Sequence, residues 1–203
     1  MANREIQEQR VKAYFVQAAK QIVRDEGAAA VKVKRVAEEA GYASGTLYNY
    51  FRDLNELLFY CVREFFQESL DHALEYAQDS TDPKTRLLAI TEAYSSYFLY
   101  NPNIYQLAFL VDLHPPEDAI TGESFQPEIV RIGEELLQQC VREGTVDPAH
   151  PETILGLLAN SIHGNLLFFL TGRAGKTTEA EVMEKIRREI SWVLEQPVPN
   201  GEI

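Results

Sequence analysis

A run of small, hydroxyl, amide and aromatic residues near position 45 carries the clearest chemistry in this sequence. Its members are Ser44, Gly45, Thr46, Tyr48, Asn49 and Tyr50. N–H groups at a helix start and side-chain hydroxyls bind phosphate oxygens, and an asparagine amide can form two hydrogen bonds with adenine. These residue types therefore suit contact with duplex nucleic acid. From local chemistry alone, an ordinary pair of crossed helices with surface tyrosines is an equally open interpretation.

These side chains need a helix, a turn and a second helix to position them. The spacing of apolar residues predicts a first helix over Val33 to Ala40. Gly41 should end it, because glycine reaches left-handed backbone angles without a Cβ clash. A second short helix is predicted from about Ser44 to Phe51, with Leu47 and Phe51 as its buried anchors.

The run from Ala37 to Leu58 resembles the DNA-binding region of the TetR family of bacterial transcriptional regulators. The resemblance rests on the order Ala37, Gly41, Gly45, Thr46, Leu47, Tyr48, Tyr50, Phe51, Glu56, Leu57 and Leu58. It covers about the first quarter of the chain, and the rest is similar only in length and all-helical pattern. The resemblance implies DNA contacts from Lys34, Ser44, Gly45, Thr46, Tyr48, Asn49 and Tyr50.

Three positions depart from the family pattern. Family members usually carry Ser or Thr where Ala43 stands, so the reading helix lacks one N-cap, which Ser44 would supply one residue later. Many carry a basic residue at the positions of Ser44 and Leu54, and hydroxyl residues where Val31 and Lys32 stand. DNA binding would then depend more on basic side chains just before the turn, at Lys32, Lys34 and Arg35.

Charge is divided unevenly along the 203 residues. The formal net charge is -12, yet residues 1–52 hold nine Lys/Arg against six Asp/Glu, and the remainder holds 10 against 25. A basic N-terminal region on an acidic body is expected when only one end meets a polyanion. The composition therefore agrees with nucleic-acid binding at the N-terminal end.

The sequence predicts an all-α fold of about nine helices. We expect a three-helix helix-turn-helix domain over residues 1–52 and a ligand-binding and dimerisation helical bundle over residues 53–203. The expected helices cover about residues 9–26, 33–40, 44–51, 53–79, 82–101, 103–113, 125–143, 152–171 and 178–196, with a loop over 114–124. Asp53 with Glu56 and Thr178 with Glu181 form capping-box patterns.

The last two predicted helices are amphipathic and could simply be core. The TetR resemblance implies instead that they pair with their copies in a second subunit as a four-helix interface. The candidate interface residues are Gly156, Ala159, Gly164, Val182, Ile186, Ile190 and Val193.

Aromatic residues are frequent in the predicted body, where they would either fill a core or line a pocket. The candidate pocket residues are Phe65, Phe66, Tyr94, Tyr97, Phe98, Tyr105, Phe109, His163 and Phe168. A pocket of this composition favours a hydrophobic or aromatic small molecule.

No pattern in the sequence calls for a cofactor, a metal or catalysis. Cys61 and Cys140 lack metal-ligand or disulfide spacing, the histidines lack metal-binding spacing, and no secretory signal opens the chain, so we expect a cytoplasmic protein. Polar residues interrupt the apolar run from Ile154 to Leu170, which argues against a membrane span. The TetR resemblance implies a non-enzymatic, ligand-responsive homodimeric DNA-binding regulator, acting as a repressor on a palindromic operator. An all-helical enzyme or small-molecule-binding module with a purely structural helix-turn-helix is the alternative.

Overall fold

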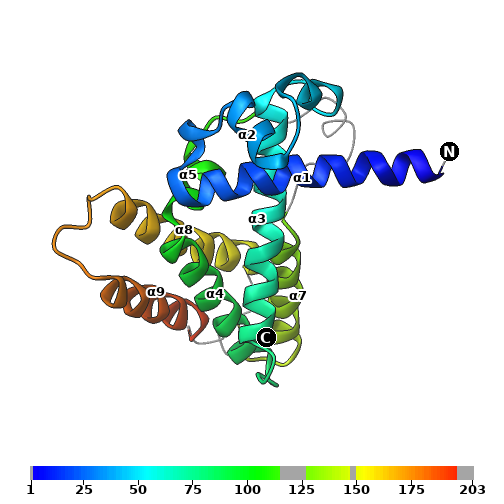
Figure 1. Cartoon of the computed structure of the whole chain (residues 1–203). Helices are drawn as coiled ribbons and strands as arrows, with labels where there is room; N and C mark the ends of the chain where they lie inside the picture. The colour runs from blue at the N-terminus through cyan, green and yellow to red at the C-terminus, as the bar shows by residue number, and fades with distance from the viewer. Residues whose placement is uncertain (1, 115–126, 147–149, 196–203) are drawn as a thin grey trace. The chain divides into compact units, whose positions relative to one another are not determined.

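The computed structural model describes residues 2–114, 127–146 and 150–195, and throughout these ranges the regular structure is helical (Figure 1). Its α-helices are α1 (Ala2–Glu26), α2 (Val33–Ala40), α3 (Leu54–Tyr76), α4 (Pro83–Tyr100), α5 (Pro102–Leu110), α7 (Glu128–Arg142), α8 (Pro151–Leu170) and α9 (Glu179–Leu194). Two short 3₁₀ helices, η1 (Ala28–Ala30) and η2 (Ser44–Asn49), join them. The predicted all-α fold is confirmed.

The chain divides into two compact units, one of residues 1–66 with 101–125 and one of residues 67–100 with 126–203. Helix α3 begins in the first unit and ends in the second, and α5 returns to the first. The predicted functional boundary between residues 52 and 53 remains a prediction, and the compact units do not divide there. The predicted loop over 114–124 lies, apart from His114, outside the described residues.

The first unit closes a small core around α1. Four of its side chains are essentially inaccessible to solvent: Phe15 of α1, Leu47 of η2, Phe51 in the segment between η2 and α3, and Leu57 of α3. The Phe15 ring meets the Phe51 ring edge-on at 6.3 Å between centroids. The rings of Tyr42, Tyr50 and Phe51, which flank η2, pack against the Phe15 ring of α1, while Tyr48 and Asn49, next to the buried Leu47, are exposed.

A buried cation also belongs to the first unit. Lys20 is only 4% exposed, and its Nζ lies 3.2 Å from a carboxylate oxygen of Glu64 and 5.4 Å from the ring centre of Phe65. The carboxylate and the ring face both compensate a charge that would otherwise be costly to bury. This contact ties the middle of α1 to α3.

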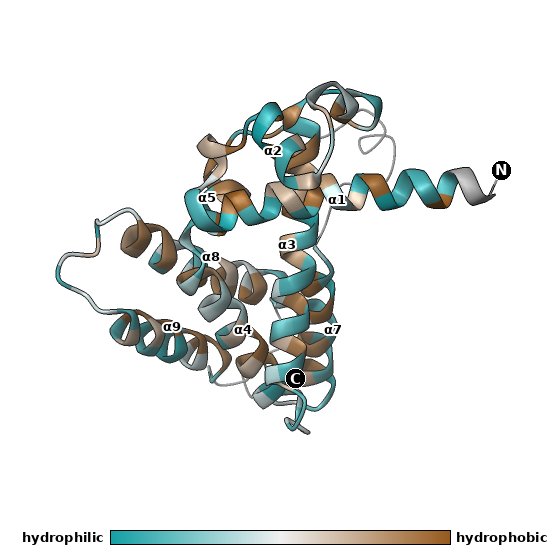
Figure 2. Cartoon of the chain, in the orientation of Figure 1, coloured by the Kyte–Doolittle hydropathy of each residue, from teal (hydrophilic) through white to brown (hydrophobic). Residues whose placement is uncertain are grey.

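The second unit packs α4 against α7, α8 and α9. Its largest buried side chains include Leu87, Ile90, Leu137 and Leu166. Figure 2 shows hydrophobic and hydrophilic residues alternating along α9, as expected for an amphipathic helix with one buried face. The second unit therefore has its own core.

One of the two predicted capping boxes is formed. Thr178 and Glu181 form the predicted capping box at the start of α9. At α3, the Asp53 side chain accepts a hydrogen bond from the Glu56 amide at 2.8 Å, but Glu56 accepts from the amide of Arg52, one residue earlier than a capping box requires. Helix α1 begins at Ala2, earlier than the predicted start near Gln9.

Candidate nucleic-acid interface and effector pocket

Gly41 sets the turn between α2 and η2. Its backbone is left-handed, with φ of 78°, and its amide donates to the Glu38 carbonyl at 3.1 Å. The next amide, that of Tyr42, donates to the Ala37 carbonyl at 2.8 Å. These two bonds satisfy carbonyls at the end of α2 and reverse the chain toward η2.

The second element of the motif is a 3₁₀ helix over Ser44–Asn49, whereas a helix reaching Phe51 was predicted. Ala43 is its N-cap and has no side chain that can accept a hydrogen bond, and Ser44 is the first helical residue rather than a replacement cap. A segment of six residues without a cap is too short to stabilise α-helical geometry, and tighter 3₁₀ turns are common in such short pieces.

The predicted DNA-contacting residues lie on the outer side of this motif. Leu47 is fully buried. The exposed members of the predicted set are Lys34, Ser44, Gly45, Tyr48 and Asn49, and the half-buried ones are Thr46 and Tyr50. The structure thus brings six of them together on η2 and the adjoining Tyr50, with Lys34 on α2.

The basic residues before the turn differ in their surroundings. The Lys34 side chain is 80% exposed and its Nζ lies 3.8 Å from a Glu38 carboxylate oxygen. Arg35 instead forms two hydrogen bonds with Glu26, one of them at 2.8 Å, which lower the pKa of that carboxyl. Because its guanidinium is already paired, Arg35 is a poorer candidate for a phosphate contact than Lys34.

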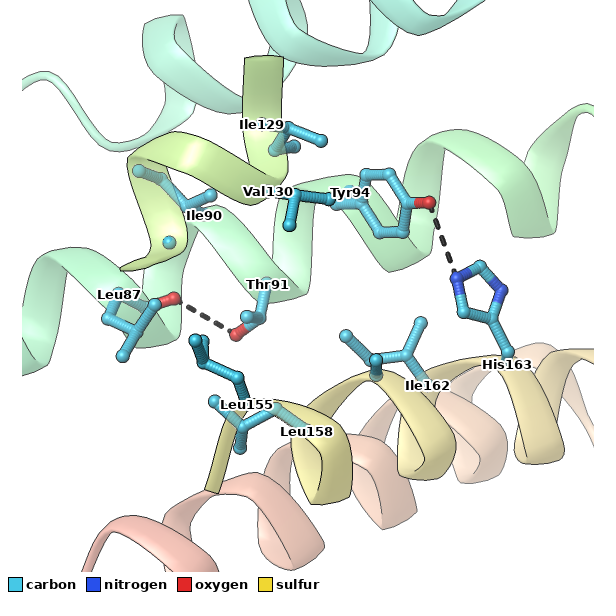
Figure 3. A pocket seen from close by; sticks show the side chains of 12 residues that line it. Leu87, Ile90, Thr91, Tyr94, Ile129, Val130, Leu155, Leu158, Ile162 and His163 are labelled. Carbon is cyan, nitrogen blue, oxygen red and sulfur yellow. Dashed lines mark hydrogen bonds between the residues drawn. The ribbon is translucent and has the colours of Figure 1, made fainter. Parts of the chain in front are cut away.

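An apolar pocket lies within the second unit, between α4, α7 and α8 (Figure 3). Its volume is about 140 Å³, and it is open on one side. We call it the effector pocket; its walls are Leu87, Ile90, Thr91, Tyr94, Ile129, Val130, Gly133, Leu155, Leu158, Ala159, Ile162 and His163. Most of this lining is aliphatic, so the pocket favours an apolar occupant.

Polar groups in the effector pocket are few. The Tyr94 hydroxyl and His163 Nε2 lie 3.4 Å apart, and Figure 3 shows the two side chains pointing toward one another from α4 and α8. The Thr91 hydroxyl hydrogen-bonds carbonyls of its own helix, Leu87 at 3.0 Å and Leu88 at 2.8 Å. Burial lowers the pKa of His163, which keeps the imidazole neutral at pH 7.

Of the nine predicted pocket residues, Tyr94 and His163 line the effector pocket and seven do not. Phe65, Phe66, Tyr105 and Phe109 belong to the first unit, where the Phe66 and Phe109 rings meet edge-on at 5.7 Å. In the second unit, Phe98 is buried in the core, Tyr97 donates to Glu68 at 2.8 Å, and Phe168 is 55% exposed. The aliphatic lining was missed because leucine and isoleucine at helical spacing have the same pattern in a pocket wall and in a core.

The predicted dimer residues divide into two groups. Val182, Ile186 and Ile190 are 0–3% exposed, so they pack inside the chain and cannot face a partner, which corrects that part of the prediction. These residues lie on the side of α9 that packs against α4 and α8. Gly156 and Ala159 are exposed and Gly164 and Val193 are half-buried.

Large apolar side chains are nevertheless exposed on α8 and α9. Leu157, Phe168 and Trp192 are 47%, 55% and 63% exposed, and Leu157 and Trp192 share a shallow groove. We call these three residues the α8–α9 apolar surface. Helix α8 is also long and apolar enough to cross a membrane by length and composition, a test that core helices of soluble proteins pass as well.

Metal-ligating side chains are not gathered into a site in the described ranges. No group of three or more His, Cys, Asp or Glu residues there could hold a metal ion. Burial raises the pKa of Cys61 to about 12 and also raises that of Cys140, so both thiols stay protonated at pH 7.

The geometry is that of an all-helical protein with an N-terminal helix-turn-helix and a helical body that contains an apolar pocket. Residues 15–61 match the sequence model described as bacterial regulatory proteins, tetR family. Over these residues the chain is similar to the DNA-binding region of that family.

A curated relative and several solved structures resemble the chain. The relative is the HTH-type transcriptional regulator SAB2452 of Staphylococcus aureus (strain bovine RF122 / ET3-1), 28% identical over 119 residues. That match spans 47% of this chain and 63% of the relative, which is less than two thirds of its length.

Two similar structures hold small molecules. FadR of Thermus thermophilus, a TetR-family transcriptional repressor solved with lauroyl-CoA, has a TM-score of 0.65 at 15% identity over 95% of this chain and 98% of that one. RolR, solved with resorcinol, has a TM-score of 0.66 at 14% identity over 97% and 98%. At such identities the likeness concerns the fold.

Proposed function

We propose that this chain is a cytoplasmic, non-enzymatic transcriptional repressor that binds a palindromic operator as a homodimer and releases it when a hydrophobic or aromatic small molecule binds. The observation that supports DNA binding is the pattern of exposure along η2. Leu47 is fully buried, and the residues exposed around it are Ser44, Gly45, Tyr48 and Asn49. Hydroxyl, amide and backbone groups on one outward face suit phosphates and base edges.

The homodimer is supported by the α8–α9 apolar surface. Three large apolar side chains exposed on neighbouring helices are typical of a surface that another protein covers. Gly156 and Gly164 have no atom of the described chain within 4 Å of where a Cβ would stand, so a partner helix could approach them closely. Two copies would then present two reading elements to half-sites about 34–36 Å apart on successive turns of DNA.

The effector pocket supports regulation by a small molecule. The two ligand-bound neighbours bind compounds that contain apolar parts, and this chain has an apolar pocket of its own. An effector weakens DNA binding only to the extent that it binds more tightly to the conformation with lower DNA affinity. Helix α3 contributes to both compact units and offers a continuous connection between them.

The first experiment measures binding of the full chain to its own promoter DNA by fluorescence anisotropy at several salt concentrations. Tyr48→Ala should weaken binding to every duplex, whereas Asn49→Ala should mainly relax sequence preference. Tyr76→Ala is the matched control, because Tyr76 and Tyr48 are both 58% exposed and Tyr76 lies in the second unit. If the wild type shows no salt-dependent binding to duplex DNA, the proposal is wrong, and an enzyme or a small-molecule-binding module is favoured instead.

A second experiment tests the basic contact. Lys34→Ala should reduce the slope of log affinity against log salt by about 1, as expected when one phosphate contact is lost. Lys185→Ala removes the same charge from a similar helical ion pair, since Lys185 lies 3.7 Å from Glu189. An equal effect of both substitutions would show that only net charge matters. Repression itself is tested with a promoter fusion, whose expression should rise when the gene is deleted.

A further inference from the structure

The effector pocket contains no Asp, Glu, Lys or Arg among its lining residues. An ionised ligand would leave its hydration shell without meeting an opposite charge, and that loss is large in an apolar site. The imidazole of His163 does not alter this balance, because burial keeps it neutral at pH 7. The pocket therefore selects against anions and cations.

The volume of the effector pocket limits the size of the ligand. About 140 Å³ is close to the roughly 150 Å³ of an engineered apolar cavity that binds benzene. Pockets for drug-sized ligands are larger, at about 300–1,000 Å³. A single ring fills this space, whereas a long acyl chain would leave most of its length outside the pocket.

The Tyr94–His163 pair is the polar feature that can orient such a ring. The hydroxyl oxygen and Nε2 are 3.4 Å apart. This distance is longer than that of a good hydrogen bond, which is roughly 2.7–2.8 Å for an O–H donor and roughly 2.9–3.0 Å for an N–H donor. A ligand hydroxyl beside the pair, within hydrogen-bond distance of both atoms, can donate to Nε2 and accept from the tyrosine hydroxyl. One long contact is then replaced by two shorter ones.

Thr91 is less suited to read the ligand. Its hydroxyl is within hydrogen-bond distance of two carbonyls of α4, so its proton is already directed to the helix. Isoleucine and leucine side chains form most of the remaining wall and offer only apolar contact. A sugar, with a hydroxyl on nearly every carbon, would leave most of those hydroxyls unpaired.

We infer that the effector is a neutral, single-ring molecule with a hydroxyl group, a simple phenol, whose hydroxyl lies within hydrogen-bond distance of both Tyr94 and His163. This inference rests on the proposed function and specifies the ligand class of the same pocket. The ring contacts the aliphatic side chains of α4, α7 and α8, and the hydroxyl pairs with the two polar groups. Specificity for the hydroxyl then comes from Tyr94 on α4 and His163 on α8.

The test measures direct binding to the full-length protein without DNA, by isothermal titration calorimetry at pH 7. The probes are phenol, toluene, benzoate and dodecanoate. Toluene replaces the phenol hydroxyl by a methyl group of similar size, benzoate adds a charge, and dodecanoate adds length. Phenol should bind roughly two- to tenfold more tightly than toluene, the range expected for one net hydrogen bond, and more tightly than both acids.

Substitutions locate the effect. Tyr94→Phe and His163→Leu should each reduce phenol affinity to about that of toluene and leave toluene affinity unchanged. Tyr97→Phe is the matched control, because Tyr97 lies on the same helix, bonds Glu68 and does not line the pocket. Gly133→Ala should weaken phenol and toluene alike, since its new Cβ would occupy pocket space and meet Leu155 only at an ordinary 4.0 Å.

Each outcome decides the inference separately from the proposed function. Tighter binding of benzoate or dodecanoate than of phenol, or an unchanged phenol affinity in Tyr94→Phe, overturns the phenol class. The DNA-binding experiment would still stand in that case. Phenol binding with the expected substitution pattern but without any duplex binding overturns the regulator and keeps the pocket chemistry. Thermal unfolding by circular dichroism confirms that each variant is folded.

Discussion

Two glycines of the helix-turn-helix, each replaced by alanine in its own variant, test the contributions to folding and to DNA contact separately. Gly41 has φ of 78° and ends α2, whereas the backbone of Gly45 is not in the left-handed region. Neither has any described atom within 4 Å of a built Cβ, so a methyl group meets no steric obstacle at either position. The two alanine variants therefore differ in backbone strain and in location alone.

The expected magnitudes follow from that difference. In Gly41→Ala, the left-handed conformation costs about 1–2 kcal/mol, and the stiffer unfolded chain offsets about 0.4–1 kcal/mol, which leaves a net loss of about 1 kcal/mol. For a chain of this size the melting temperature should fall by about 2–4 °C. In Gly45→Ala only the favourable entropy remains, so stability should be unchanged or higher by up to about 1 kcal/mol.

Affinity for DNA should change in the opposite order. Gly45 is exposed on η2, where the proposal requires close approach of the DNA backbone. A methyl group that displaces one charge-assisted hydrogen bond to phosphate costs about 1.5–3 kcal/mol, which corresponds to roughly tenfold or more in affinity. Gly41→Ala should bind with nearly the wild-type affinity at temperatures where it is folded.

The assay combines thermal unfolding by circular dichroism with fluorescence anisotropy on promoter DNA, using the same protein preparations. Gly41→Asn should unfold at a temperature between Gly41→Ala and the wild type, because asparagine tolerates the left-handed region better. An unchanged melting temperature in Gly41→Ala would refute the strain argument. Wild-type affinity in Gly45→Ala would refute the placement of Gly45 at the DNA.

Further predictions concern the second unit. Trp192 is the single tryptophan of the chain and is 63% exposed, so Trp192→Glu should yield monomers in sedimentation experiments, and wild-type fluorescence should shift to the red on dilution. Arg187 donates two hydrogen bonds, of 2.6 and 2.8 Å, to the buried carboxylate of Glu92. Arg187→Ala should lower the free energy of unfolding in urea by about 2 kcal/mol, because it leaves that carboxylate without its partner. The double variant with Glu92→Leu should lose less, since no charge is then left unpaired. Because the pKa of His163 is lowered in the folded state, the unfolded chain binds the proton more readily. The free energy of unfolding should then fall as the pH drops below about 6.5, and fall less in His163→Gln.

Local rules were sufficient to predict most of the helices. Apolar spacing and Gly41 predicted α2 over Val33–Ala40, the bounds that the structure has. The Thr178 and Glu181 pattern predicted the start of α9, and Asp82 accepts hydrogen bonds from the amides of Lys84 and Thr85 at the predicted start of α4. Caps and breaks act between residues that are neighbours in sequence, so a single sequence contains the information.

The dimer and pocket predictions depended on information that a single sequence does not hold. An apolar stripe such as Val182, Ile186 and Ile190 shows that something covers it, but the covering element can lie in the same chain or in another. Here α4 and α8 cover it, and the large apolar residues exposed on α8 and α9 are Leu157, Phe168 and Trp192. A pocket is likewise a gap between side chains of distant helices, and residue types alone do not show where packing is incomplete.

Helix α4 offers a second connection, beside α3, between the effector pocket and the first unit. Residues of α4 line the pocket, and the chain continues from its end at Tyr100 into Asn101 and α5, which belong to the first unit. There Arg24 of α1 donates to the Asn101 side chain at 3.2 Å, and Asn103 donates to the Arg24 carbonyl at 3.1 Å. A displacement of α4 that moves Asn101 with it would strain or break these hydrogen bonds, which lie at the end of α1 that precedes the helix-turn-helix.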